Sequence, residues 1–206
     1  MTIYYSDIEN FDDEFFSSST AYYPEKKKHS MLNSKNETAK RESILAWRIV
    51  SEFCKGKGEV LENEHGKPYF EKGGSFFSIS HSVGKVIVAV DEHEVGADIQ
   101  KIRHASDEVA RRVLSENEIE VCSKSADKAF CFTKFWTLRE CYTKFYGTSI
   151  TQNLNSLDFS KFLDDESFSY KDLFFYSVKR GDFSVSVCSE NSLDEIVFRQ
   201  VNQTDF

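Results

Sequence analysis

The sequence is poor in residues that break or cross-link a chain. Its 206 residues include two prolines, at positions 24 and 68, and no stretch is rich in glycine or proline. A low-complexity linker is therefore not indicated. The five cysteines are odd in number and scattered, with no CxxC pair. This pattern indicates reduced thiols and predicts a cytoplasmic protein.

Long apolar runs and an excess of positive charge are also missing. The longest uninterrupted aliphatic stretch covers residues 86–90, far too few to cross a membrane. The first residues are acidic and aromatic, unlike a signal peptide. The net charge of −8 argues against nucleic acid or an anionic membrane as a partner. An acidic protein that binds a polyphosphate must instead gather its few basic residues locally.

Phenylalanine is abundant, with 19 copies, and hydrophobic residues make up 40% of the chain. Aromatic rings remove a large apolar area from water, so this composition suits a globular core. The length allows one large domain or two small ones.

The apolar pattern changes period along the chain. Extended segments are predicted over residues 76–80, 85–91, 95–100 and 183–187, with a possible closing strand over 196–201. Helices are predicted from about residue 35 to 54, and from 127 to 146. Together these elements predict an α+β fold.

Helix ends are marked by local signals. Ser34 and Glu37 have the spacing of a capping box, as do Ser115 and Glu118. Gly147 is expected to end the long helix.

Three segments carry candidate chemistry. SISHS at residues 78–82 places His81 at the end of a strand. GADIQ at 96–100 puts Asp98 inside an apolar strand, where a carboxylate needs a cation, a metal or hydrogen-bond donors. WTLRECYTK at 136–144 places Glu140 and Lys144 on one helical face. Each segment also has an ordinary structural explanation when it is taken alone.

Taken in order with GKP at 66–68, the three segments resemble the motif set of the surfactin-type 4′-phosphopantetheinyl transferases. Those motifs read roughly GKP, (F/L)N(I/L)SHS, G(I/V)D(I/V)E and W(S/T)xKE(A/S)(Y/F)xK. The resemblance spans residues 66–147 and, more loosely, reaches back to about residue 26. It implies transfer of 4′-phosphopantetheine from coenzyme A to a serine of an acyl or peptidyl carrier protein.

The resemblance implies a metal site and a catalytic group. Asp98 and Glu140 match the carboxylates that hold Mg²⁺ on the coenzyme A pyrophosphate, and Mn²⁺ suits such oxygen ligands too. Gln100 stands where many relatives have a third acidic ligand. Glu140 is the expected acceptor of the serine proton, and Lys144 would neutralise charge on the departing 3′,5′-ADP.

Further residues are implied to contact coenzyme A. Arg41 resembles the basic residue for the 3′-phosphate, with the lysines at 26–28 as possible helpers. The full expected set is Arg41, Lys67, Ser80, His81, Arg139, Lys144, Lys26 and Lys28. Arg139 takes the place of a family lysine. Glu118 matches a family acidic position, and it is also the closing residue of the possible capping box.

The resemblance further implies a monomer with two similar α+β halves, residues 1–94 and 95–206, and a coenzyme A cleft between them. A non-catalytic module that binds coenzyme A or a carrier protein is the main alternative, favoured by the neutral Gln100. A metal-dependent phosphohydrolase is less well supported, because the usual His and Asp clusters are missing from the sequence.

Overall fold

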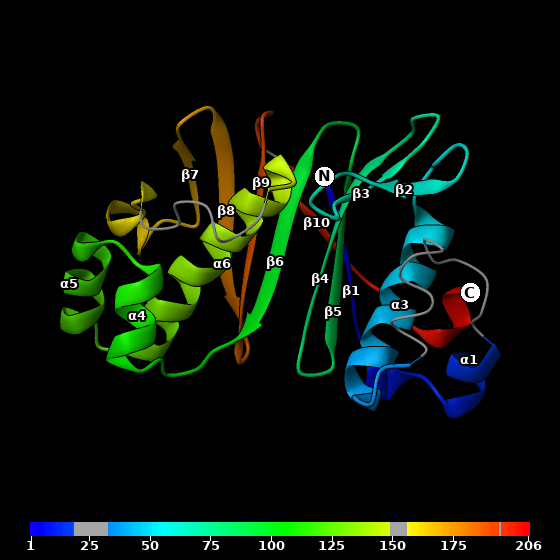
Figure 1. Ribbon diagram of the computed structural model, residues 1–206, viewed down its shortest axis with the longest axis horizontal. Coiled ribbons are helices and arrows are strands. Elements are labelled where there is room, and N and C mark those ends of the chain that lie inside the picture. The colour runs from blue at the N-terminus through cyan, green and yellow to red at the C-terminus, as the bar shows by residue number, and fades with distance from the viewer. Residues whose placement is uncertain (19–32, 149–155, 194) are drawn as a thin grey trace. The chain divides into compact units, whose positions relative to one another are not determined.

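Figure 1 shows the computed structural model, which describes residues 1–18, 33–148, 156–193 and 195–206. The chain divides into two compact units. Unit 1 comprises Met1–Val95 and Asp194–Phe206, and unit 2 comprises Gly96–Leu193. Both units combine helices with sheets, which confirms the predicted fold class. Among the described helices, none has the length and apolar character to cross a membrane.

The main sheet of unit 1 has four strands in the order β10-β1-β5-β4. β1 (Thr2–Asp7) lies between β10 (Val197–Gln200), which runs parallel to it, and β5 (Lys85–Asp91), which runs antiparallel. The final strand therefore returns the chain to the sheet in which it began.

β4 (Phe76–Ser82) and β5 form an antiparallel hairpin, so the extended segments predicted there are confirmed. Val83 and Gly84 make the turn, both with positive φ. A valine rarely adopts this conformation, and the register from Phe76↔Asp91 to Ser82↔Lys85 holds it in place.

The long helix of unit 1 is α3 (Glu37–Phe53), which packs on β4 and β5 (Figure 1). Its start corrects the prediction of a capping box that begins at Ser34. Asn36 is the N-cap, and its side chain accepts a hydrogen bond from the Ala39 backbone N–H. Asn and Ser cap comparably well, so residue type alone does not distinguish Ser34 from Asn36.

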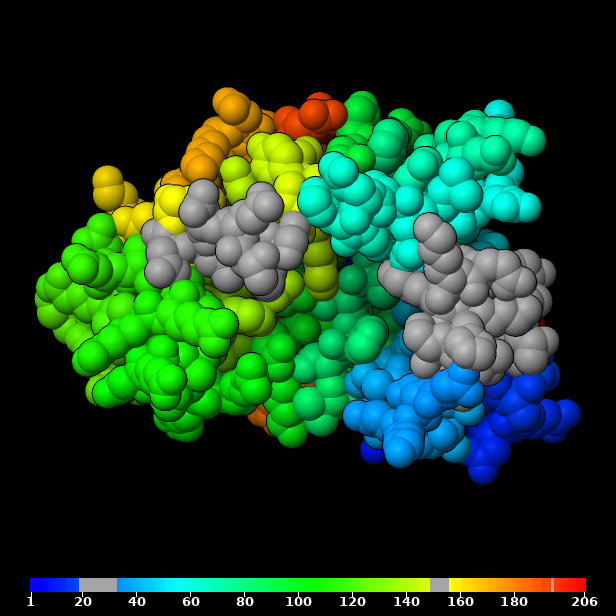
Figure 2. All heavy atoms as spheres, in the orientation of Figure 1, coloured from blue at the N-terminus to red at the C-terminus, as the bar shows by residue number. Residues whose placement is uncertain are grey.

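The remaining elements of unit 1 are short. β2 (Val60–Glu62) and β3 (Pro68–Phe70) form a separate hairpin, on the surface of unit 1 in Figure 2. The others are η1 (Ile8–Asn10), α1 (Asp13–Ser18) and η4 (Gln203–Asp205).

The core of unit 1 lies between α3 and the sheet, and it is rich in aromatic rings. Phe11, Phe15 and Phe16 from the N-terminal segment join Trp47 and Phe77 there. The rings of Phe11 and Phe15 lie 4.5 Å apart, and Trp47 meets Phe77 edge to face at 6.1 Å. Much of the phenylalanine is thus used for packing, as the composition indicated.

Unit 2 has a four-stranded sheet in the order β6-β9-β8-β7. The strands are β6 (Val95–Lys101), β7 (Ser167–Tyr170), β8 (Leu173–Arg180) and β9 (Phe183–Ser189). β7, β8 and β9 form an antiparallel meander, and β6 lies beside β9.

Three helices accompany this sheet: α4 (Asp107–Val113), α5 (Glu116–Lys124) and α6 (Lys128–Tyr146), with the short η3 (Ser160–Phe162). α6 packs on β9, whereas α4 and α5 lie at the surface of unit 2 (Figures 1 and 2). The predicted ends of α6 are confirmed, because Asp127 caps its start and Gly147 ends it with φ 58°.

The layer between α6 and β9 contains a buried hydroxyl cluster. Thr137 Oγ1 lies 3.1 Å from Ser184 Oγ and 2.8 Å from Ser186 Oγ, and Ser177 Oγ lies 2.9 Å from Ser186 Oγ. The serines of β9 alternate with Val185 and Val187, and their hydroxyls are satisfied by one another and by Thr137 in the interior.

Candidate active site

Asp98 lies in the middle of β6, with 5% of its surface exposed. Side chains alternate along a strand, so Gly96, Asp98 and Gln100 share one face. A Cβ added to Gly96 would come within 2.0 Å of the Cys141 carbonyl oxygen on α6 and 2.7 Å from the Phe145 backbone nitrogen. Only glycine allows this approach, which brings the face of Asp98 against α6.

Lys144 supplies the cation that a buried Asp98 was predicted to need. Its Nζ lies 2.7 Å from Asp98 Oδ1, which makes a charge-assisted hydrogen bond. The lysine side chain is partly exposed and lies on the last turn of α6. Residues 46 positions apart in sequence thus form one ion pair.

Glu140 lies one helical turn before Lys144. Burial and then the negative charge of Asp98 raise the pKa of Glu140 to about 7, against an opposing effect of Lys144. Two carboxyl groups that interact in this way resist simultaneous ionisation. A group whose pKa is near 7 can take up a proton at neutral pH.

The donor set fits a divalent cation that completes its coordination from a substrate. Within the described ranges, no group of three or more His, Cys, Asp or Glu side chains could hold a metal ion. Mg²⁺ usually binds one or two carboxylates together with phosphate oxygens and water, which suits Asp98 and Glu140. Gln100, on the same strand face, offers a further side-chain oxygen.

His81, at the end of β4, is held by a residue that the sequence reasoning missed. Its Nδ1 lies 2.8 Å from Glu42 Oε2 on α3. The Gly84 backbone N–H also donates to Glu42 Oε1, at 2.5 Å. Burial alone would raise the pKa of Glu42, but the hydrogen bonds from His81 and Gly84 lower it. Glu42 shares helical spacing with the buried Leu45 and Ile49, and a carboxylate on that apolar face was the available signal.

The other expected coenzyme A contacts of unit 1 have protein partners. Arg41 Nη2 lies 2.5 Å from Asp13 Oδ1, and its Nε lies 3.4 Å from Glu37 Oε1. Lys67 pairs with Glu94 and also donates to the Val95 carbonyl at 3.4 Å.

Ser80 is buried within β4. Lys26 and Lys28 lie outside the described residues.

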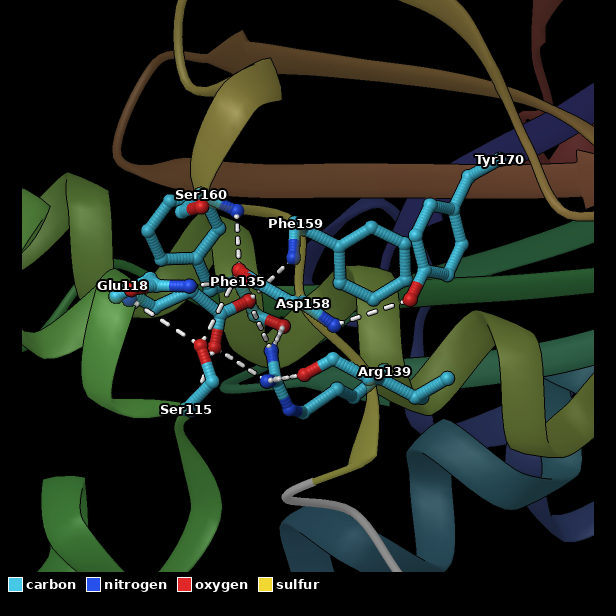
Figure 3. Close-up of polar contacts among 10 residues, drawn as sticks. Ser115, Glu118, Phe135, Arg139, Asp158, Phe159, Ser160 and Tyr170 are labelled. Carbon is cyan, nitrogen blue, oxygen red and sulfur yellow. Dashed lines mark hydrogen bonds and ion pairs between the residues drawn. The ribbon is translucent and has the colours of Figure 1, made fainter.

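Arg139, expected to contact coenzyme A, is instead enclosed in unit 2. Both it and Glu118 are 0% exposed, and the guanidinium forms a two-pronged ion pair with the Glu118 carboxylate (Figure 3). Glu118 also completes the capping box of α5, which confirms the structural role predicted for it. A buried, satisfied guanidinium is not available to a ligand in this structure.

The part of the chain that matches a known protein family is nearly the same as unit 2. A model of the 4′-phosphopantetheinyl transferase superfamily matches residues 94–190. The 4′-phosphopantetheinyl transferase gsp of Aneurinibacillus migulanus is 35% identical over 97 residues, covering 46% of this chain and 40% of that protein.

Two further relatives have similar coverage. The 4′-phosphopantetheinyl transferase Sfp of Bacillus subtilis is 33% identical over 96 residues, 45% of this chain and 43% of its own. The L-aminoadipate-semialdehyde dehydrogenase-phosphopantetheinyl transferase of Saccharomyces cerevisiae is 33% identical over 107 residues, 46% of this chain and 39% of its own. The chain thus spans about two fifths of the length of these curated relatives.

The matched segment contains Asp98, Glu140 and Lys144, so the resemblance carried by the motifs is confirmed over residues 94–190, which match the 4′-phosphopantetheinyl transferase superfamily.

Proposed function

We propose that this protein transfers the 4′-phosphopantetheine group of coenzyme A to a serine hydroxyl of an acyl or peptidyl carrier protein. The observation that carries the proposal is the meeting of Asp98, Glu140 and Lys144 inside the segment that matches the superfamily. The relatives' own names describe phosphopantetheinyl transfer.

Each of the three side chains has a role in this transfer. Glu140, with its pKa near 7, accepts the proton of the attacking serine hydroxyl. A bond forms between the serine oxygen and the β-phosphorus of coenzyme A, and the bond from that phosphorus to the departing 3′,5′-ADP oxygen breaks. Lys144, which holds Asp98 in the structure, offsets the negative charge that develops on the leaving group.

Asp98 and Glu140 are the proposed ligands of a divalent cation, Mg²⁺ or Mn²⁺, with Gln100 as a weaker neutral donor. When bound, such an ion would offset the charge of the pyrophosphate. Its charge would also favour the ionised form of Glu140, which burial and the charge of Asp98 otherwise oppose.

The phosphates and nucleotide of coenzyme A are proposed to contact Arg41, Lys67, Ser80 and His81, together with Lys26 and Lys28. The ion pairs of Arg41 and Lys67 would have to exchange a carboxylate for a phosphate, a replacement that suits both cations. Arg139 leaves this set because its charge is used inside unit 2. A monomer acting in the cytoplasm, independent of nucleic acid and membranes, completes the proposal.

The test is incubation of several apo carrier proteins with coenzyme A, with and without Mg²⁺, followed by intact mass measurement. The proposal expects a gain of one phosphopantetheine group that depends on the metal. No gain on any carrier would contradict it. Tight coenzyme A binding by calorimetry without transfer would instead favour the non-catalytic binding module, for which the neutral Gln100 is the motivating feature.

A further inference from the structure

The buried pair of Glu118 and Arg139 connects three parts of unit 2 (Figure 3). Arg139 Nη1 donates to Glu118 Oε1 at 2.7 Å, and Nη2 donates to Glu118 Oε2. Nη2 also donates to the Leu157 carbonyl at 2.8 Å. The Phe159 backbone N–H donates to Glu118 Oε1 at 2.9 Å. One ion pair thus joins α5, α6 and residues 157–159.

The start of α5 is fixed a second time by Asp158. Its Oδ2 accepts from Asn117 Nδ2 at 2.7 Å, and its Oδ1 accepts from Ser115 Oγ at 3.2 Å. The Ser115 backbone N–H donates to Glu118 Oε2 at 2.8 Å. Glu118 is therefore held by hydrogen bonds from the backbone of Ser115 and Phe159, and Arg139 is the side chain of α6 that pairs with it.

The contact between Arg139 and Glu118 bears on the rotation of α6 about its own axis. Successive helical residues diverge by about 100°, so Arg139 points into unit 2 while the adjacent Glu140 faces towards Asp98. A guanidinium held at both Nη atoms, and bonded to the Phe135 carbonyl one turn back, resists rotation of the helix about its axis. The same rotation would move Glu140 and Lys144 relative to β6.

The contact between α6 and β6 leaves little tolerance for such movement. Gly96 has no room for even a Cβ against Cys141 and Phe145, so the two backbones are as close as packing permits. The 2.7 Å bond from Lys144 to Asp98 depends on that spacing. Small errors in the position of reacting groups reduce turnover steeply, by about 10²-fold for 1 Å.

We propose that Glu118 and Arg139 are positioning residues, which set the rotation of α6 and thereby hold Glu140 and Lys144 against Asp98. The proposal rests on the transfer reaction proposed above. Neither residue touches the reacting atoms, and the pair acts only through the helix. Burying two charges carries a desolvation penalty, and the positioning role gives this buried pair a function.

The test must separate positioning from folding. Removing one partner leaves a buried charge without its counterion, so Arg139→Met alone is expected to unfold the protein. The double variant E118L/R139M replaces both charges with apolar side chains of similar volume, an exchange that often preserves stability. R139K keeps the charge as a single point and loses the planar fork.

The expected result is that E118L/R139M folds and that its kcat falls by about tenfold or more, while its KM for coenzyme A changes by less than about threefold. The single variant R139K should have a kcat between those of the wild type and of E118L/R139M. It also supplies the comparison with the wild type if the double variant does not fold. The matched control is K134M, which removes another buried cation of α6, one that donates to the carbonyls of Leu163 and Asp165. It should reduce stability with kcat unchanged.

A crystal structure of E118L/R139M gives a readout that needs no activity. The proposal expects the Lys144 Nζ to Asp98 Oδ1 contact of 2.7 Å to be broken. A double variant with that contact intact and a wild-type kcat would overturn the proposal while leaving the transferase function standing. An inactive wild type with a broken contact in the variant would overturn the function alone and support the positioning role.

Discussion

The two units share an order of elements but differ in what they bury. In unit 1, β1 is followed by α3 and then by the β4–β5 hairpin, and β1 pairs with β5. In unit 2, β6 is followed by α6 and then by the β8–β9 hairpin, and β6 pairs with β9. This shared order supports the duplication implied by the resemblance, which stays a prediction.

Buried charge separates the units. Among the described residues, Glu42 is the only charged side chain that unit 1 buries, whereas unit 2 buries Asp98, Glu118, Lys134 and Arg139. The superfamily match, residues 94–190, also coincides with unit 2. Charges are costly to bury without partners, so their concentration in one unit indicates where precise placement of polar groups matters.

Substitution of Glu140 in unit 2 should reduce kcat far more than substitution of an exposed glutamate. Glu140→Gln removes the proton acceptor, and we expect kcat to fall by about 10³-fold with coenzyme A binding retained. Intact mass kinetics and calorimetry measure the two quantities. Glu120→Gln, on the exposed side of α5, is the control and should leave kcat unchanged. Near-normal turnover of the Glu140 variant would remove Glu140 from the role of base.

The close contact between β6 and α6 gives the next largest effect. Gly96→Ala would place a Cβ 2.0 Å from the Cys141 carbonyl oxygen, so strand and helix must move apart. We expect the free energy of unfolding to fall by about 3 kcal/mol. Gly181→Ala has open space but φ +57°, and should cost only about 1 kcal/mol. Equal losses in urea denaturation would show that the contact is not tight.

The pH dependence of stability tests the environment of Glu140 without any substrate. Its pKa is raised from 4.5 to about 7, so between these values the folded state keeps a proton that the unfolded state has released. Wild-type stability should therefore fall as pH rises from 4.5 to 7 relative to that of Glu140→Gln. We expect a change of about 2 kcal/mol in metal-free buffer, since partial exposure weakens the full effect. A constant difference would mean an ordinary pKa.

The buried carboxylate of unit 1 should affect stability rather than chemistry. Glu42→Gln loses the charge that holds His81, and we expect a loss of about 1.5 kcal/mol at neutral pH. The pKa of Glu42 is lowered, so its stabilisation is present above its ordinary pKa of 4.5 and disappears as pH falls through the lower folded value. Urea denaturation from pH 3 to 7 measures both. A variant deficit that persists at pH 3 would show that the ionised carboxylate of Glu42 is not the source of the stabilisation.

The surface pair of unit 1 should have the smallest effect. Asp13→Ala removes an exposed partner of Arg41, and such pairs contribute about 0.5 kcal/mol or less. Under the proposed function the freed Arg41 binds the coenzyme A phosphate at least as well, so KM should not rise. A large loss of stability would show that unit 1, too, depends on charge.

Much of the local structure was predictable from local signals. The β4–β5 hairpin, β6, and both ends of α6 follow from apolar spacing, turn residues and the Gly147 stop. The start of α3 was wrong by two residues because Ser34 and Asn36 are both competent caps. Propensity alone does not choose between two good caps that are close in sequence.

The site was only half predictable. The motifs identified Asp98, Glu140 and Lys144, and the need of a buried carboxylate for a cation is elementary electrostatics. Glu42 was missed because an acidic residue on a helix is usually solvated. Arg139 was placed with the ligand contacts because sequence shows the charge of a residue but not whether that charge is enclosed.

The sequence by itself determined the β4–β5 hairpin, β6, α6 and the three chemical groups, because helical and extended periods and side-chain chemistry are local properties. Only the tertiary structure decided which charges meet. Lys144 pairs with Asp98 across 46 residues, and Arg139 pairs with the buried Glu118 while its neighbour Glu140 lies in the field of Asp98. These choices depend on the approach of α6 to β6 at Gly96, a contact between segments that no local pattern specifies.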